Sequence, residues 1–186
     1  MERPRKTLKH YNNPGHAHVL TFSCYQRLPL LSRDRTRNWL VEALDAARSR
    51  QNFAVLAYVI MPEHAHVLVY PRDDKADVSA FLKSVKQSVA RKAKLHLARH
   101  APEWIRRLTV RTPSGPVFRF WQQGPGFDRN IYSLDALRKE IEYIHNNPVR
   151  RGLTESPAEW EWSSAQWLAN PGVGKLKIDS IDEIFE

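Results

Sequence analysis

The sequence predicts an α+β fold in which one antiparallel β-sheet packs against helices on one face or both. Two observations lead to this class and to the expectation of a single domain. Short apolar segments rich in β-branched and aromatic residues alternate with segments of helical periodicity, in the order β-α-β-β-α-β(β)-α. No convincing linker divides the 186 residues, so we expect one domain with C-terminal additions.

The first half of the chain opens with a basic N-terminal arm, residues 1–15, which we expect to be loose. Residues 16–27, HAHVLTFSCYQR, predict the first strand. Ser32 is the expected N-cap of a helix over 33–50. A buried strand over 53–61, a turn at Pro62 and Glu63, and a strand over 64–70 follow, and the two strands predict a β-hairpin.

A long helix is expected at 77–99, with Asp77 as its N-cap. At about 100° per residue, one arc of this helix is apolar and faces the core. The apolar residues are Val78, Phe81, Leu82, Val85 and Val89. The opposite side is basic and polar, with Lys83, Lys86, Gln87 and Lys94. A solvated lysine face is the ordinary interpretation of such a helix.

The second half begins with a connecting loop at 100–117, in which a short strand is the alternative. Short strands at 118–122 and 127–132 follow, around Gly124-Pro125-Gly126. Ser133 predicts the start of a helix that Pro148 ends near Asn147. Ser156-Pro157 predicts a last short helix, and a weak strand and an acidic end follow. This helix is expected to carry Trp160, Trp162 and Trp167.

The charge balance favours a polyanionic partner. Lys and Arg outnumber Asp and Glu by 29 to 20, which gives a net charge of +9 and a pI near 9.9. A basic surface without a ligand is the plain alternative. Cys24, the single cysteine, is expected in the core of a cytoplasmic protein, because it has no internal disulfide partner. No signal peptide or membrane span is expected.

Two His-x-His pairs are the first candidates for chemistry. Residues i and i+2 of a strand point to the same face, so two such imidazoles can converge on one divalent ion. His64 and His66 follow a buried strand and a turn, at the expected end of a sheet. His16 and His18 follow the N-terminal arm within a near-identical sequence. We favour the second pair as ligands and interpret the first as structural or substrate-facing.

The helix expected at 133–147 carries the second candidate. Leu137, Ile141 and Ile144 form its buried stripe. Tyr143 and Asn147 lie one turn apart on the face turned away from that stripe, whereas His145 shares the stripe as a core residue. A tyrosine phenolate can attack a DNA phosphodiester. A divalent metal can neutralise the phosphate charge, and an amide oxygen can add a third protein ligand.

These segments resemble a known family. VIMPEHAHVLV, residues 59–69, resembles the His-hydrophobic-His strand of single-tyrosine transposases of the IS200 type. YIHNNPVRRGL, residues 143–153, resembles the Tyr-Ile-x-x-Asn-Pro-x-x-x-Gly signature of their REP-associated branch. FWQQGPGFDRNI, residues 120–131, resembles that branch's segment ahead of the catalytic helix. The resemblance spans roughly residues 16–153.

The resemblance implies a ferredoxin-like HUH-type nuclease domain over 16–153, with a helical extension at 154–186 packed on it. It implies a transposase that depends on Mg²⁺ or Mn²⁺ and cleaves single-stranded DNA near hairpins. The products would be a 5′-phosphotyrosine and a free 3′-hydroxyl. Carried over by position, Tyr143 is the nucleophile, and the metal ligands are His64, His66 and Asn147. Many relatives have the longer Gln in place of Asn147.

Basic residues throughout the chain are candidates for contacts with DNA phosphates. These candidates are Arg150, Arg151, Lys83, Lys86, Lys94, Arg5 and Lys6. Trp121 and Phe127 are candidates for stacking on bases, with core packing as the alternative. Both a monomer and a homodimer agree with the sequence.

Two rival functions remain open. One is a non-catalytic nucleic-acid-binding module of ferredoxin-like fold, and the other is a metal-dependent hydrolase of small substrates. The second is disfavoured because no set of Asp and Glu residues is arranged to complete a two-metal site.

Overall fold

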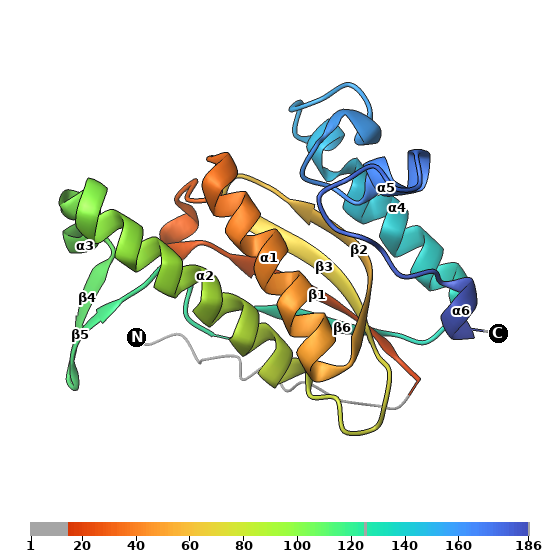
Figure 1. Cartoon of the computed structure of the whole chain (residues 1–186), viewed down its shortest axis with the longest axis horizontal. Helices are drawn as coiled ribbons and strands as arrows, with labels where there is room; N and C mark the ends of the chain where they lie inside the picture. The colour runs from red at the N-terminus through yellow and green to blue at the C-terminus, as the bar shows by residue number, and fades with distance from the viewer. Residues whose placement is uncertain (1–14, 125, 186) are drawn as a thin grey trace, which may run out of the picture.

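The structure is a computed structural model that describes residues 15–124 and 126–185. The expected N-terminal arm, with Arg5 and Lys6, lies outside the described residues apart from Gly15. A four-stranded sheet with the order β2-β3-β1-β6 forms the centre of the molecule, and every neighbouring pair is antiparallel (Figure 1). Its strands are β1 (Ala17–Ser23), β2 (Phe53–Ile60), β3 (His64–Pro71) and β6 (Phe127–Ile131).

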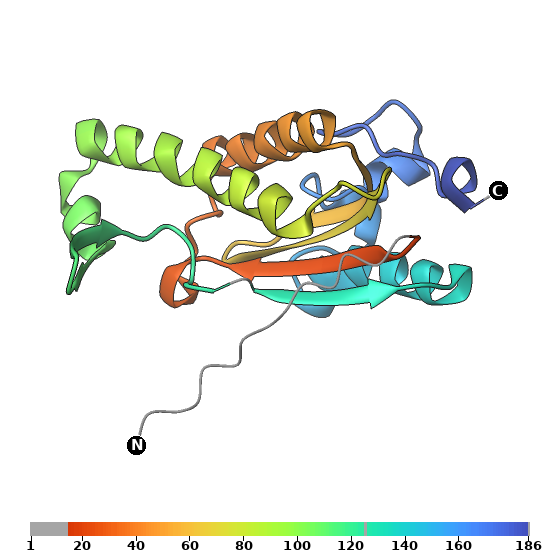
Figure 2. The same ribbon diagram turned by 90° about the horizontal axis from the view of Figure 1, so that it is seen from below.

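Helices cover both faces of this sheet. Figure 2 shows α1 (Asp34–Gln51) and α2 (Val78–His100) above the sheet and α4 (Leu134–Arg150) below it. The connectivity β1-α1-β2-β3-α2-β6 with this strand order is that of a ferredoxin-like fold. The predicted α+β class, with one antiparallel sheet and packed helices, is therefore confirmed.

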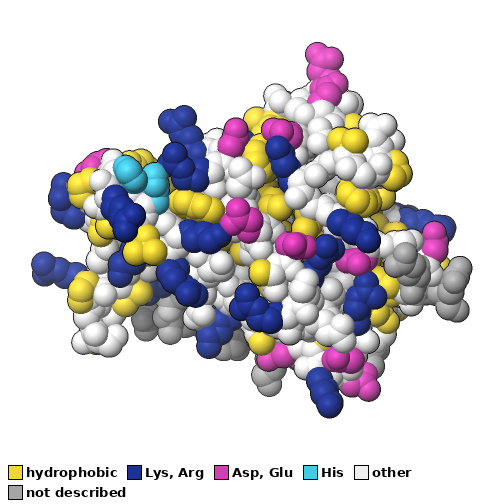
Figure 3. Space-filling model, viewed as in Figure 1, with side chains coloured by type: hydrophobic (Ala, Val, Ile, Leu, Met, Phe, Trp, Pro, Cys, Tyr) yellow, Lys and Arg dark blue, Asp and Glu magenta, His cyan; other side chains and the backbone are white. Residues whose placement is uncertain are grey.

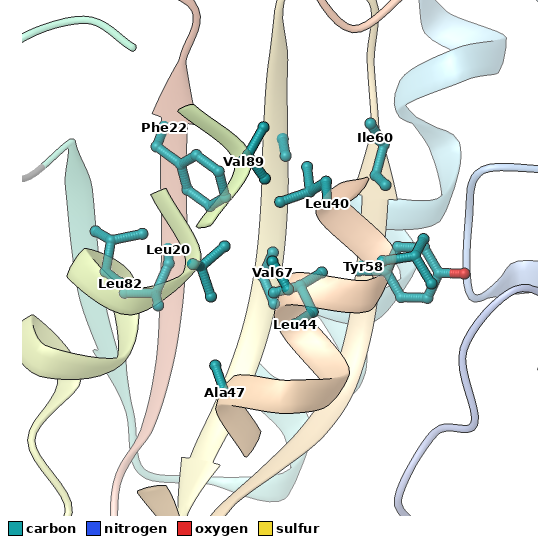
Figure 4. Close-up of a cluster of buried hydrophobic side chains, with 14 of the residues drawn as sticks. Leu20, Phe22, Leu40, Leu44, Ala47, Tyr58, Ile60, Val67, Leu82 and Val89 are labelled. Carbon is teal, nitrogen blue, oxygen red and sulfur yellow. The ribbon is translucent and has the colours of Figure 1, made fainter. Parts of the chain in front are cut away.

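The main core lies between the sheet and the pair α1 and α2. Leu40 and Leu44 of α1 pack with Leu82 and Val89 of α2 over the strands, and all four side chains are buried (Figure 4). The apolar stripe predicted for α2 is buried in full, and Asp77 caps this helix by accepting from Ser79 N at 2.8 Å. Cys24 belongs to this core, and burial raises the pKa of its thiol to about 12.

A second core lies under α4. Leu137, Ile141 and Ile144 pack against Val19 of β1 and Leu68 of β3. This burial confirms the predicted stripe and leaves the rest of α4 free to present polar side chains. The prediction for the end of the helix was wrong, because α4 continues through Pro148 to Arg150.

Asn147 explains how the helix passes the proline. Pro148 has no N–H to donate to the carbonyl of Ile144. The side-chain amide of Asn147 donates to that carbonyl at 3.4 Å and to the carbonyl of Tyr143 at 2.8 Å. The carbonyl that the proline leaves without its usual donor is therefore still satisfied.

Three other boundaries differ from the predictions. Arg33, not Ser32, precedes α1, because the Ser32 hydroxyl donates to the carbonyl of Pro29. The expected first strand ends at Ser23, and residues 25–27 form the 3-10 helix η1 (Tyr25–Arg27). The expected strand at 118–122 is not formed as one strand, because Phe118 ends β5 and Trp121 makes an isolated bridge to Cys24.

The segment at 100–117, predicted as a loop with at most a short strand, contains more regular structure than that. It forms α3 (Pro102–Arg107), β4 (Thr109–Thr112) and β5 (Gly115–Phe118), and the two strands make a separate antiparallel ribbon. The prolines and glycine that predicted a loop lie at the first turn of α3 and in and around the β4–β5 turn. These residues therefore mark element boundaries within the segment.

Residues 154–185 pack along the free edge of β2. The carbonyl of Trp162 accepts from Ile60 N at 2.8 Å, and the Asp179 carboxylate accepts from Val55 N at 2.8 Å. The short helix predicted after Ser156 is the 3-10 helix η2 (Pro157–Glu159), followed by α5 (Ala165–Ala169) and α6 (Asp182–Phe185). Trp160 and Trp162 therefore lie between helices, and the expected weak strand is not formed among the described residues of this segment.

No helix in the described part of the chain has the length and apolar character needed to cross a membrane.

Candidate active site

His64 and His66 lie on the α4 face of the sheet, at the start of β3. Their Nε2 atoms are 3.1 Å apart, and the planes of the two rings are nearly perpendicular. Each ring is held by a second contact on its other nitrogen. His66 Nδ1 lies 2.8 Å from the Thr21 hydroxyl, and His64 Nδ1 lies 3.2 Å from the Glu63 carboxylate.

The contact with Glu63 indicates which nitrogen of His64 can bind a metal. When Nδ1–H of His64 donates to Glu63, its Nε2 carries a lone pair. Burial, followed by the charge of His64, lowers the pKa of His66 to about 4. Burial also lowers the pKa of His64, although Glu63 opposes this effect. Both rings are neutral at pH 7, and their Nε2 atoms face the same point, as a divalent ion requires of two imidazole ligands.

Glu63 connects this strand to the end of α4. Its Oε1 atom accepts from His64 Nδ1 and from Arg151 Nη1, the second at 2.7 Å. Burial raises the pKa of Glu63, but the hydrogen bond from Arg151 and the nearby charges outweigh it and lower that pKa overall. The carboxylate is therefore ionised, and it links His64 to Arg151 at the end of α4.

Tyr143 lies on α4 and faces the histidine pair. Its ring is nearly perpendicular to that of His66, with centroids 6.0 Å apart. The side chain is 43% exposed, as its position opposite the buried stripe predicts. The Arg150 guanidinium lies 5.1 Å from the centre of the tyrosine ring. An exposed hydroxyl-bearing ring thus lies beside one imidazole of the pair and a positive charge.

Asn147 lies one turn after Tyr143 and is half-buried. Its Nδ2 atom is committed to the helix carbonyls of Tyr143 and Ile144. With the amide nitrogen held in this way, the amide oxygen is the atom left to accept a hydrogen bond or bind a metal. Among residues 15–124 and 126–185, no cluster of three His, Cys, Asp or Glu side chains is placed to hold a metal ion.

A groove of about 600 Å³ runs from His66 and Tyr143 between α4 and the edge strand β6. Phe127 lines it and is 49% exposed. Arg129 and Lys139 add positive charge, and Arg129 is paired with the buried Glu140. An exposed ring and cations beside Tyr143 suit an unpaired nucleotide.

Trp121 does not share this exposure. It is buried, it packs edge-on against Phe22, and its Nε1 donates to the carbonyl of Lys86. Core packing therefore accounts for Trp121, whereas Phe127 keeps the stacking interpretation.

The first histidine pair lies elsewhere. The two near-identical segments form neighbouring strands, with His18 opposite Val69 and Thr21 opposite His66. His18 therefore points to the α1 and α2 face. It is fully buried, and its Nδ1 lies 3.0 Å from Asp128. His145 is also buried, with Nε2 2.7 Å from the Ser164 hydroxyl, and burial lowers its pKa to about 4.

The basic residues expected to bind DNA are dispersed. Lys83 lines a groove between α1 and α2, on the face of the sheet opposite α4, and Lys94 is exposed further along α2. Lys86 is partly buried, and its ammonium donates to the carbonyl of Gly124 at 3.0 Å. Burial lowers the pKa of this ammonium. Arg150 and Arg151 lie next to Tyr143 and Glu63, so of the described basic candidates these two are at the site.

Sequence reasoning missed Thr21 as a residue that orients His66. Its contact depends on the register between β1 and β3, which no local pattern states. Glu63 was expected mainly to polarise the turn before the histidine pair, with assistance at the metal as the alternative. The position of Glu63 next to His64 was the available signal, and its pairing with Arg151 needed the tertiary structure.

Comparison with known proteins places this geometry in context. The family model described as "Transposase IS200 like" matches residues 13–112, a segment that contains both histidine pairs and ends before Tyr143. A curated protein of Haemophilus influenzae, described as a REP-associated tyrosine transposase, is 24% identical over 171 residues. That alignment covers 81% of this chain and 90% of the relative.

A solved structure described as a REP-associated tyrosine transposase bound to a REP hairpin has the same fold. The TM-score is 0.69 at 18% identity, over 90% of this chain and 87% of the other.

Proposed function

The chain belongs to the family of IS200-like transposases, and on this basis we propose that it is a metal-dependent single-stranded DNA endonuclease and strand transferase that uses Tyr143 as its nucleophile. The family assignment establishes a DNA transposase in general terms, and the resemblance to the REP-associated branch agrees with both relatives. The observation that carries the finer proposal is the position of Tyr143, which faces His66 with ring centroids 6.0 Å apart.

The reaction is a phosphodiester transesterification. The Tyr143 oxygen forms a bond to the phosphorus, the bond from phosphorus to the 3′-oxygen breaks, and the proton lost by the tyrosine balances the one gained by the departing 3′-hydroxyl. The energy of the phosphodiester is kept in the 5′-phosphotyrosine. Attack by another 3′-hydroxyl then reverses the chemistry and joins the strand to a new partner.

His64 and His66 would hold the metal ion through their Nε2 atoms, with the Asn147 amide oxygen as third ligand. When bound, Mg²⁺ or Mn²⁺ neutralises charge on the scissile phosphate. Thr21 and Glu63 keep the two rings oriented, and burial keeps both imidazoles unprotonated at pH 7. Arg150 adds a fixed positive charge beside the attacking ring.

The substrate we propose is single-stranded DNA next to a hairpin. The related solved structure is described as bound to a REP hairpin. The groove beside Tyr143, with exposed Phe127, has the features that an unpaired base requires. The net charge of +9 favours binding of a polyanion, whether single-stranded or duplex.

The test compares Tyr143→Phe with Tyr132→Phe, because Tyr132 is also exposed, at 77%, and does not line the groove. Each variant is incubated with Mn²⁺ and a labelled hairpin oligonucleotide with single-stranded flanks. Covalent adducts are then resolved on a denaturing gel. Tyr143→Phe should abolish the adduct, and Tyr132→Phe should retain it.

An adduct that persists in Tyr143→Phe would show that another residue is the nucleophile. Hairpin binding that is indifferent to EDTA, with no adduct from the unsubstituted protein, would identify the non-catalytic binding module instead.

A further inference from the structure

A basic projection extends from the end of the sheet that carries the histidine pair. It consists of α3, β4 and β5, residues 102–119, and is called the spur here. Figures 1 and 2 show it beyond the C-terminal end of α2, away from the four-stranded sheet. The spur contains four arginines and one acidic residue, Glu103. The arginines are Arg106, Arg107, Arg111 and Arg119.

The arginines of the spur are available to a partner. Arg106, Arg107 and Arg111 are exposed, and none of them forms an ion pair with the described residues. The Arg107 guanidinium lies over the Trp104 ring at 4.6 Å, which leaves its charge on the surface. Figure 3 shows Lys and Arg side chains over the visible face, with little acidic surface among them at this end of the molecule.

The spur is held in a defined position. Leu108 is fully buried, and its carbonyl accepts from Arg119 N at 2.7 Å. The Thr109 hydroxyl donates to the carbonyl of Ile105, and the Thr112 hydroxyl to that of Gly115. The first of these hydroxyl bonds ties the start of β4 to α3, and the second closes the β4–β5 turn. The positions of the arginines on α3 and β4 are therefore set before any partner binds.

The base of the spur adjoins the candidate site. Tyr25 N donates to the carbonyl of Phe120, and Gln122 N donates to that of Ser23. Ser23 is the β1 partner of His64. A strand of DNA that leaves the histidine pair at this end of the sheet therefore meets the spur next.

We propose that the spur holds the duplex stem of a DNA hairpin through its phosphates, while the adjoining single strand enters the Tyr143 site. Duplex DNA suits the observations because its phosphates recur along a rigid backbone and attract exposed arginines. A two-stranded ribbon also has the width that the DNA major groove admits. The inference rests on the proposed function, since it assigns the stem of that substrate.

The experiment measures binding without cleavage. The triple variant Arg106→Ala, Arg107→Ala, Arg111→Ala is compared with Arg50→Ala, Lys75→Ala, Lys177→Ala, which removes the same charge from exposed positions near the other end of the sheet. Fluorescence anisotropy in EDTA gives affinities for a tailed DNA hairpin and for the single-stranded tail alone, from 50 to 300 mM salt. Thermal unfolding verifies that each variant is folded.

The spur variant should bind the tailed hairpin roughly 10–100-fold more weakly, and the slope of log K against log salt should fall by roughly 2–3, at about 0.9 for each lost phosphate contact. Its affinity for the tail should be unchanged. The control variant should lower the affinity for the tailed hairpin and for the tail equally and only slightly. A variant with lysine in place of the same three arginines should keep both the affinity for the hairpin and the salt slope. This variant is the comparison to use if the alanine variant unfolds.

An unchanged salt slope for the spur variant, or an equal loss of affinity for the tail, would overturn the proposal. Failure of the covalent-adduct experiment would leave these binding measurements intact, so the two proposals fail separately.

Discussion

Glu63 contacts both parts of the candidate site, the strand with the histidine pair and the end of α4, so that one substitution there affects both. Its Oε1 atom accepts from His64 on the metal-binding strand and from Arg151 at the end of the helix that carries Tyr143. Residues that orient a ligand commonly change metal affinity 10–100-fold when replaced. A carboxylate at this position also favours the ring tautomer that leaves Nε2 free.

We expect Glu63→Gln to weaken Mn²⁺ binding roughly 10-fold, because the amide keeps the size of the side chain but loses the charge that holds His64 and Arg151. Isothermal titration calorimetry measures the affinity directly, without DNA. Glu142→Gln is the matched control, since Glu142 is an exposed carboxylate on α4 that does not contact either histidine. Equal affinities for the two variants would show that Glu63 does not position the ligand.

The site residues differ in whether the sequence alone could predict them. The spacing of His64 and His66 was sufficient to predict convergent imidazoles, because strand geometry puts i and i+2 on one face. The helical angle of Tyr143 was sufficient to predict its exposure. Thr21 was out of reach, because a contact 45 residues away depends on strand register.

The helix was wrongly predicted to end before Pro148, and the reason is local. A proline normally ends a helix near the residue before it, but here the side chain of Asn147 serves the carbonyl that the proline leaves without a donor. A residue selected as a metal ligand thus also has a structural role in its helix.

At the scale of elements, the close approach of β6 to β1 depends on Gly126. Its φ is +86°, and a Cβ atom there would lie 2.3 Å from the backbone oxygen of Thr21. Thr21 also holds His66, so the turn before β6 and the candidate site share one residue. Gly124 has a φ of +106° but open space around its Cβ position.

We expect Gly126→Ala to lower the free energy of unfolding by about 3 kcal/mol, through strain at positive φ and displacement of Thr21. Gly124→Ala should cost about 1 kcal/mol, because only the backbone conformation is unfavourable. Urea unfolding followed by circular dichroism gives both values. The same loss in both variants would mean that the approach to Thr21 tolerates a methyl group.

Elements with strong periodicity were predicted well, including the β2–β3 hairpin and both long helices. The segment at 100–117 was not, because its prolines and glycine also occur in ordinary loops. Its two strands pair with each other and not with the main sheet, so they lack the alternation that a half-buried strand shows. The short helices near the C-terminus depend on contacts with β2, which local sequence does not encode.

At the scale of the whole molecule, residues 154–185 complete the fold along the β2 edge. Trp162, Leu176 and Ile178 from this segment are buried in the main core. Burial of a Leu or Ile contributes roughly 2 kcal/mol, and loss of a buried Trp costs roughly 3–5 kcal/mol. Their sum is comparable with the total stability of a domain of this size, which is about 5–15 kcal/mol.

Deletion of residues 154–186 should therefore abolish cooperative unfolding and expose the β2 edge to pairing with other chains. Light scattering after size exclusion should show aggregates of the truncated chain. Asp179→Ala is a milder companion that removes the acceptor for Val55 N, and it should lower the melting temperature without aggregation. A monomeric truncated chain with an unchanged melting temperature would contradict this role.

The placement of Tyr143 and His66 within one polypeptide has a consequence for stoichiometry. Under the proposed chemistry, a chain that keeps its own nucleophile beside its own metal ligands can hold one broken DNA end at a time. A mobile segment has two ends. Excision would therefore take two chains acting together or two successive rounds on one chain, and the number of covalent tyrosines per excised segment distinguishes them.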